Sequence, residues 1–164
     1  MNKTKKMTTI TMLVAISILF HMIESMIPLP IPIPGFKLGL ANIVGLVALY
    51  LFDSKVMLEV NVLRVILASL LRGILFGTGF YLSMSGVLLS CLACVIAYKK
   101  TSMSIFGVSV AGSVFHAVGQ VLAVSFIYQQ FFMQAMLPVL MILAIPTGLG
   151  MAFISKQVLK RINI

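Results

Sequence analysis

Charged side chains are scarce in this chain of 164 residues, since they make up 9% of it and only three of them are acidic. Soluble domains carry charge on about a quarter of their residues, so this composition excludes an ordinary soluble domain. The sequence also lacks a P-loop of the form GxxxxGK(S/T), which would cradle the phosphates of ATP. Any energy from nucleotide hydrolysis would therefore have to come from partner proteins.

Cysteine is nearly absent as well, because the chain contains only Cys91 and Cys94. Their C-x-x-C spacing lies inside an apolar run. A redox motif needs an accessible thiolate, and a zinc site needs further ligands close by. We therefore interpret the two cysteines as small residues buried in a membrane helix, and we predict neither a metal site nor a cofactor.

Hydrophobic residues are what the chain has in excess, at 61% with a mean hydropathy of +1.17. A spanning helix needs about 20 mostly apolar residues, which leaves room for about six spans with short loops. Lipid offers the backbone no hydrogen-bond partners, and these runs lack the alternation of barrel strands, so all of them should be helices. The sequence predicts an all-α membrane protein with one integral membrane domain over residues 1–164 and helices near 8–27, 36–52, 56–76, 78–98, 105–128 and 132–155.

The first of these segments resembles a signal peptide, because lysines precede an apolar stretch. That stretch continues to Ile27 and no small-x-small cleavage site follows it. We therefore expect it to be the first helix. The second segment is short for a span and could be partly re-entrant.

The distribution of basic residues predicts the orientation. The twelve basic residues give a net charge of +9, and only Lys37 falls in a loop on the side opposite to the N-terminus. Positive residues concentrate in cytoplasmic loops, so both termini should be cytoplasmic. The basic excess is then a signal of topology rather than of nucleic-acid binding. The residues on the cytoplasmic side are Lys3, Lys5, Lys6, Lys55, Lys99, Lys100, Lys156, Lys160 and Arg161.

Four prolines separate the first two helices in the stretch "PLPIPIPG". Proline at alternate positions cannot be helical and favours a stiff, extended chain. We expect this loop, which is followed by Lys37, to lie across the outer face of the membrane as a lid. Its prolines are Pro28, Pro30, Pro32 and Pro34.

Polar residues at membrane depth carry most of the functional information. Ionisable groups there are costly and usually face the bundle interior or a cavity. In the first helix Ser17, His21, Glu24 and Ser25 fall on one side. Similar stripes run along the third helix, through Asn61, Arg64, Ala68 and Arg72, and along the fifth, through Ser109, Gly112, His116, Gly119 and Gln120. We predict an outward cavity lined by His21, Glu24, Asn42, Arg64, Arg72, His116 and Gln120.

Each of these residues also has a purely structural interpretation. Arg72 could extend to the outer membrane interface, as long basic side chains often do. Arg64 lies too deep for that, and its structural alternative is a pair with Glu24 or Glu59. His116 and Gln120 could simply form hydrogen bonds between helices.

Three stretches together resemble a known family: "IESMIPLPIPIPGFKLGLANIVGLVALYLF", "LRVILASLLRG" and "GVSVAGSVFHAVGQ". They are similar to the Gx transporter family, often labelled heptaprenyl diphosphate synthase component I, and so to the S components of energy-coupling factor (ECF) transporters. The resemblance implies a six-helix bundle in the bacterial plasma membrane. Such a protein captures a vitamin-like compound from outside and works with a coupling membrane protein and ATPases.

The chemistry of the residues suggests roles for the predicted side chains, and the resemblance suggests a gate and a ligand. Arg64 and Arg72 would bind an anionic group through their permanent charge and forked donors, and His116 and Gln120 would orient the ligand. The proline loop would act as the gate. A flavin or flavin nucleotide is the first expected ligand, and a quinone or isoprenoid precursor is the second.

The synthase label finds no support in the residues. Prenyl transfer normally uses aspartate-rich motifs to hold magnesium and diphosphate, whereas Asp53 is the only aspartate. We therefore expect no enzyme. The alternative is a membrane accessory or scaffold subunit for prenyl diphosphate or quinone metabolism, which would have no ligand-sized cavity. Many S components carry alanines four apart in the first helix, but Ala15 is followed by Leu19 here, so a shared coupling module, a dedicated partner and action without a module all stay open.

Overall fold

The computed structural model of the protein describes residues 3–26, 39–129 and 131–162. Helices dominate these residues, which contain no strand, so the predicted all-α class is confirmed. The elements are α1 (Lys3–Met26), α2 (Leu40–Leu51), α3 (Ser54–Leu71), α4 (Thr78–Lys100), α5 (Ile105–Tyr128), a short 3₁₀ helix η1 (Phe131–Met136) and α6 (Leu137–Ile162).

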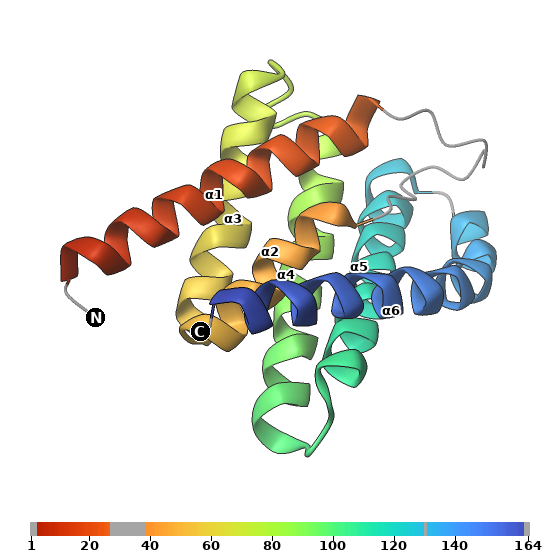
Figure 1. Ribbon diagram of the computed structural model, residues 1–164. Coiled ribbons are helices and arrows are strands. Elements are labelled where there is room, and N and C mark those ends of the chain that lie inside the picture. Colours follow the sequence, from red (N-terminus) through yellow and green to blue (C-terminus); the bar gives the residue numbers. More distant parts are fainter. Residues whose placement is uncertain (1–2, 27–38, 130, 163–164) are drawn as a thin grey trace.

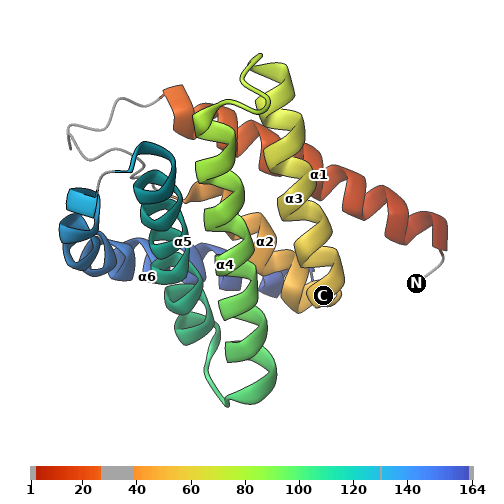
Figure 2. The same ribbon diagram turned by 180° about the vertical axis from the view of Figure 1, so that it is seen from behind.

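The helices α3, α4 and α5 stand side by side, and α1 and α6 cross the bundle obliquely (Figures 1 and 2). The centre is occupied by α2, which contacts α1, α3 and α6. Eight of its 12 residues are buried. Such a helix, apolar on most sides, is typical of the core of a bundle.

Within the described residues, four helices are long and apolar enough to cross a membrane: α1, α4, α5 and the last one, counted from Gln134 to Ile162. With 12 residues, α2 is about 18 Å long, which is less than the roughly 30 Å of a bilayer core. The remaining helix, α3, carries the charges of Lys55, Glu59 and Arg64. The structure therefore supports a multi-pass membrane protein, while six crossings stay a prediction.

Described helix ends and turns lie on two sides of the bundle. The start of α1, the turn between α2 and α3 and the end of α6 lie on one side, and the turn between α3 and α4 lies on the other (Figures 1 and 2). The cytoplasmic placement of the termini stays a prediction.

Several helix ends differ from the predicted boundaries. The third helix ends at Leu71 rather than at residue 76, because Gly73 adopts a positive φ of 66°. The backbone N–H of Gly73 then bonds to the carbonyl of Leu70 at 3.0 Å, and that of Ile74 bonds to Ser69 at 3.0 Å. These two bonds form a Schellman motif, which stops a helix while satisfying its last carbonyls.

Helices α1 and α6 extend beyond their apolar segments, to Lys3 and to Ile162. Hydropathy marks only the part of a helix that suits lipid, whereas backbone hydrogen bonds continue into the polar flanks. The late start of α6 has a separate cause, since η1 occupies the residues before Leu137. In α2, the first helical residue is Leu40, preceded by Gly39 at a φ of 82°.

The α2–α3 turn is held by Asp53, whose carboxylate accepts a hydrogen bond from the backbone N–H of Val56 at 2.8 Å. This cap satisfies a donor that has no partner inside the helix. We expect Asp53→Ala to lower the free energy of unfolding by about 1 kcal/mol, measured by circular dichroism in detergent. Equal stability of the two proteins would show that the cap contributes nothing.

The contribution of the carboxylate charge is measured as the free energy of unfolding over a series of pH values. Asp53→Asn protein is the control. The bond from Val56 lowers the pKa of Asp53 below its ordinary value of 3.8. The stabilisation by the carboxylate is therefore fully present above that ordinary value, and it is lost as the pH falls through the lowered pKa of the folded state. Asparagine keeps an acceptor without a titrating group, so the variant should lack this step.

Candidate functional site

The polar stripe of α1 faces the bundle interior, as predicted. Its buried residues are Val14, Ser17, His21 and Glu24. Ser25 departs from the prediction because it is exposed and its hydroxyl bonds to the carbonyl of Met22 in its own helix. Three polar residues of this helix are thus turned inward together with Val14.

A small cavity lies where this stripe meets the other helices, and we call it the Arg64 cavity. It encloses about 10 Å³, which is near the lower limit for a single water molecule. Five of the seven predicted site residues line it together. The complete lining is His21, Glu24, Gly39, Asn42, Arg64, Val65, Ser83, Val87 and His116.

Arg64 is buried at 2% exposure and is incompletely hydrogen-bonded. Two of its guanidinium nitrogens donate to Oδ1 of Asn42 over 3.5 and 3.4 Å, longer than the usual 2.9–3.0 Å. Its Nε has no hydrogen-bond partner in the described part of the chain. Glu24 attracts the guanidinium electrostatically, and a carboxylate oxygen of Glu24 also accepts a hydrogen bond from the backbone N–H of Gly39. The arrangement thus leaves a buried cation with donor capacity to spare.

Arg72 and Gln120, the two other predicted residues, do not line this cavity. Arg72 is the C-cap of α3 and its side chain is exposed. Gln120 is buried, and its Cγ and the ring of His116 lie against Gly86 of α4. Glu59, the alternative partner of Arg64, is exposed. The predicted loop residues Pro28, Pro30, Pro32, Pro34 and Lys37 lie outside the described residues.

Sequence reasoning missed the contribution of α4 to the site. Ser83 lines the Arg64 cavity, and Ser90 and Cys94 line a second one. These three residues recur at spacings of seven and four, which places them on one helical face. The periodicity that revealed the stripes in the other helices would therefore have revealed this one, had serine and cysteine been counted as polar positions.

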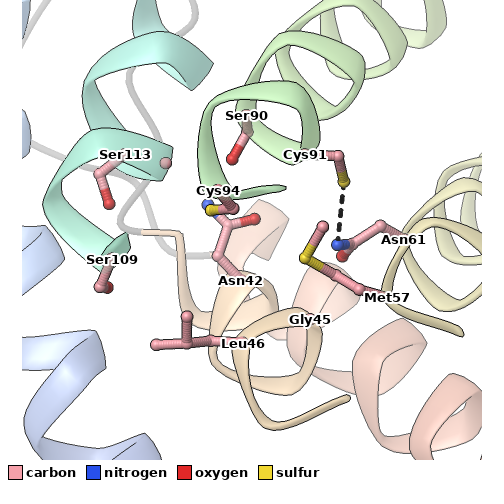
Figure 3. A pocket seen from close by; sticks show the side chains of 11 residues that line it. Asn42, Gly45, Leu46, Met57, Asn61, Ser90, Cys91, Cys94, Ser109 and Ser113 are labelled. Carbon is pink, nitrogen blue, oxygen red and sulfur yellow. Dashed lines mark hydrogen bonds between the residues drawn. The ribbon is translucent and has the colours of Figure 1, made fainter. Parts of the chain in front are cut away.

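The second cavity lies among α2, α3, α4 and α5, and we call it the thiol cavity (Figure 3). It encloses about 20 Å³, enough for about one water molecule. Asn42 lines both cavities. The full lining is Asn42, Gly45, Leu46, Met57, Asn61, Ser90, Cys91, Cys94, Ser109, Gly112 and Ser113.

Cys91 and Cys94 are free thiols and both are buried, which confirms their interpretation as small buried residues of a membrane helix. The side-chain amide of Asn61 donates to the sulfur of Cys91 at 3.4 Å, shown as the dashed line in Figure 3. The sulfur of Cys94 donates to the carbonyl of Val108 at 3.6 Å. In the described residues, no group of three or more His, Cys, Asp or Glu is placed to hold a metal ion.

Comparison with known proteins gives one finding. A family model described as heptaprenyl diphosphate synthase component I matches residues 13–158, all but the two ends of the chain. No curated protein and no solved structure matches the chain significantly.

Proposed function

Because the chain belongs to the heptaprenyl diphosphate synthase component I family, which is also called the Gx transporter family, we propose that it is a membrane substrate-binding subunit of ECF type. It captures a small, anionic, vitamin-like compound from outside the cell. The observation that carries this proposal is Arg64, a buried cation with spare donors in a cavity lined from five helices.

The chemistry of Arg64 suits an anionic ligand group. A guanidinium is permanently charged, and its forked donors match a carboxylate or phosphate. Hydrogen bonds between charged groups are shorter and stronger than the long contacts that Asn42 supplies here. An anion that entered the cavity would therefore replace a weak acceptor with a strong one. The same cavity is lined by His21, Ser83 and His116, which would orient the ligand.

The size of the cavity limits what the structure accommodates. Ligand pockets for drug-sized molecules usually enclose about 300–1,000 Å³, whereas the two cavities here have room for about one water each. Binding of a whole ligand therefore requires the surrounding helices to separate. A flavin or flavin nucleotide is the first candidate ligand and a quinone or isoprenoid precursor is the second, both through the family association.

Purification of the protein followed by mass spectrometry of its extracted small molecules tests the proposal. We expect an anionic compound that is retained by the wild-type protein and lost from Arg64→Met protein prepared in parallel. Arg72→Met is the matched control, because Arg72 is exposed and outside the cavity. Preparations of the wild-type protein that retain no such compound would contradict the proposed function.

An accessory subunit for prenyl diphosphate or quinone metabolism is the second candidate. The small cavity volumes and the attraction between Glu24 and Arg64 favour it, because a structural ion pair in a closed interior needs no ligand. We expect the chain itself not to be the catalyst, since Asp53 is exposed and serves as the cap of α3. Copurification decides between the candidates: a coupling membrane protein with ATPases supports transport, and a prenyl diphosphate synthase supports the accessory role.

A further inference from the structure

The thiol cavity differs from the Arg64 cavity in its chemistry. No charged side chain stands among the described residues that line it, but it presents two amides, three hydroxyls and two thiols. The hydroxyls belong to Ser90, Ser109 and Ser113 (Figure 3). A lining of this kind favours an uncharged group that forms hydrogen bonds over an ion, because burial of an unpaired charge is costly.

One acceptor in this cavity is unsatisfied. Asn61 is 6% exposed, and its Oδ1 has no hydrogen-bond partner among the described residues. Buried polar groups are nearly always hydrogen-bonded, so an exception calls for a ligand or an ordered water. What Oδ1 lacks is a donor, an N–H or an O–H.

Glycine lets the polar groups of this cavity pack directly against the backbones of α2 and α5. A Cβ at Gly45 would lie 2.4 Å from Nδ2 of Asn61, and a Cβ at Gly112 would lie 2.5 Å from the sulfur of Cys94. Neither position can accept a side chain unless the polar groups that line the cavity move. The positions of the Asn61 amide and the Cys94 thiol therefore depend on glycine in α2 and α5.

The two cavities meet at Asn42, which lines both. Its contacts to Arg64 are long, at 3.4 and 3.5 Å, and an anion would compete with them effectively. Once Arg64 binds an anion, the side chain of Asn42 no longer accepts hydrogen bonds from Arg64. Rotation of that side chain would join the two spaces.

We propose that the thiol cavity is an inner subsite of the binding site, where Asn61 accepts a hydrogen bond from an uncharged N–H or O–H group of the ligand. The same ligand places its anionic group on Arg64, so this inference rests on the proposed function. It narrows the substrate class to compounds that carry an anionic group and, near it, a neutral donor. An anion attached only to hydrocarbon does not belong to this class.

Access to the subsite is tested by the reaction of the native thiols with methyl methanethiosulfonate, a small uncharged reagent. Purified protein in nanodiscs is labelled, the reaction is quenched, and the mass added to the protein is measured by mass spectrometry. We expect Asn42→Ala to raise the labelling rate of Cys91 and Cys94 at least tenfold, because it removes the side-chain amide that lines both cavities. Ser85→Ala is the control, since Ser85 belongs to α4 but lines neither cavity. Variants in which one cysteine is replaced by serine show whether the label is on Cys91 or on Cys94.

Two results would overturn the inference. Folded Asn42→Ala protein whose thiols react as slowly as those of the wild type would show that the thiol cavity is a sealed packing void. An extracted ligand with an anionic group and no neutral donor, such as a prenyl diphosphate, would leave the proposed function intact but remove the inner subsite. A wild-type preparation without any bound small molecule counts against the proposed function, and thiol labelling then decides access to the subsite independently.

Discussion

Arg64→Met protein is expected to bind an anionic ligand about 100-fold more weakly than the wild type. Each hydrogen bond to a charged group contributes about 1.5–3 kcal/mol, so the loss of two such bonds costs about 3 kcal/mol or more, and 1.4 kcal/mol corresponds to a factor of ten. Methionine fills a similar volume without charge. Equilibrium dialysis with the compound extracted from the wild-type protein measures the effect.

The control for this experiment is Arg72→Met, which changes the same residue type on the same helix. Because Arg72 is exposed and lines neither cavity, we expect unchanged affinity. Equal losses in the two variants would show that net positive charge, rather than the buried guanidinium, attracts the ligand. Full retention by Arg64→Met protein would remove Arg64 from the site.

A double variant separates a ligand role of Arg64 from a structural pair with Glu24. Removal of one partner of a buried ion pair typically costs about 4 kcal/mol, because the other charge stays buried. Arg64→Met combined with Glu24→Gln removes both charges, so we expect its thermal stability to approach that of the wild type. If Arg64 binds the ligand, the stable double variant will still fail to retain it. Retention at the wild-type level would show that Arg64 is a structural partner of Glu24 and does not bind the ligand.

Gly119→Ala is expected to lower the free energy of unfolding by about 2 kcal/mol. A Cβ at this position would lie 2.6 Å from the carbonyl oxygen of Ser85 and 2.8 Å from Cα of Gly86. Both are backbone atoms of α4 that cannot rotate away, so α4 and α5 must separate. Small residues allow such close approach in membrane bundles, and the hydroxyl of Ser85 also bonds to the carbonyl of Gly119 at 3.0 Å.

Gly150→Ala on α6 is the matched control for this substitution. Apart from Gly150 itself, its chain neighbours and the nearby backbone of α6, no atom of the described residues lies within 4 Å of a Cβ at Gly150. Alanine is favoured over glycine in a helix by up to about 1 kcal/mol. We expect its stability to be unchanged or slightly higher. The chain has no tryptophan whose fluorescence could report unfolding. The unfolding of both variants is therefore followed by far-ultraviolet circular dichroism during heating in detergent. Equal stability of Gly119→Ala and the wild type would show that the two helices can move apart at no cost.

The sequence by itself determined the class of the protein and the faces of its helices. Hydropathy and a period of 3.6 residues are local properties, so they predicted the all-helical class and the inward orientation of Ser17, His21 and Glu24. The burial of Cys91 and Cys94 followed from the apolar run in which these two residues lie. Each of these inferences needed only residues within one segment.

The tertiary structure alone decided which polar residues meet. It placed Arg64 beside Asn42, left Arg72 exposed and brought Ser83 of α4 to the same cavity as Arg64. It also made Asn42 common to two cavities and limited both to the volume of about one water. Such facts depend on the distances between helices, which are fixed by contacts such as that of Gly45 with Asn61. No periodicity within a single helix contains that information.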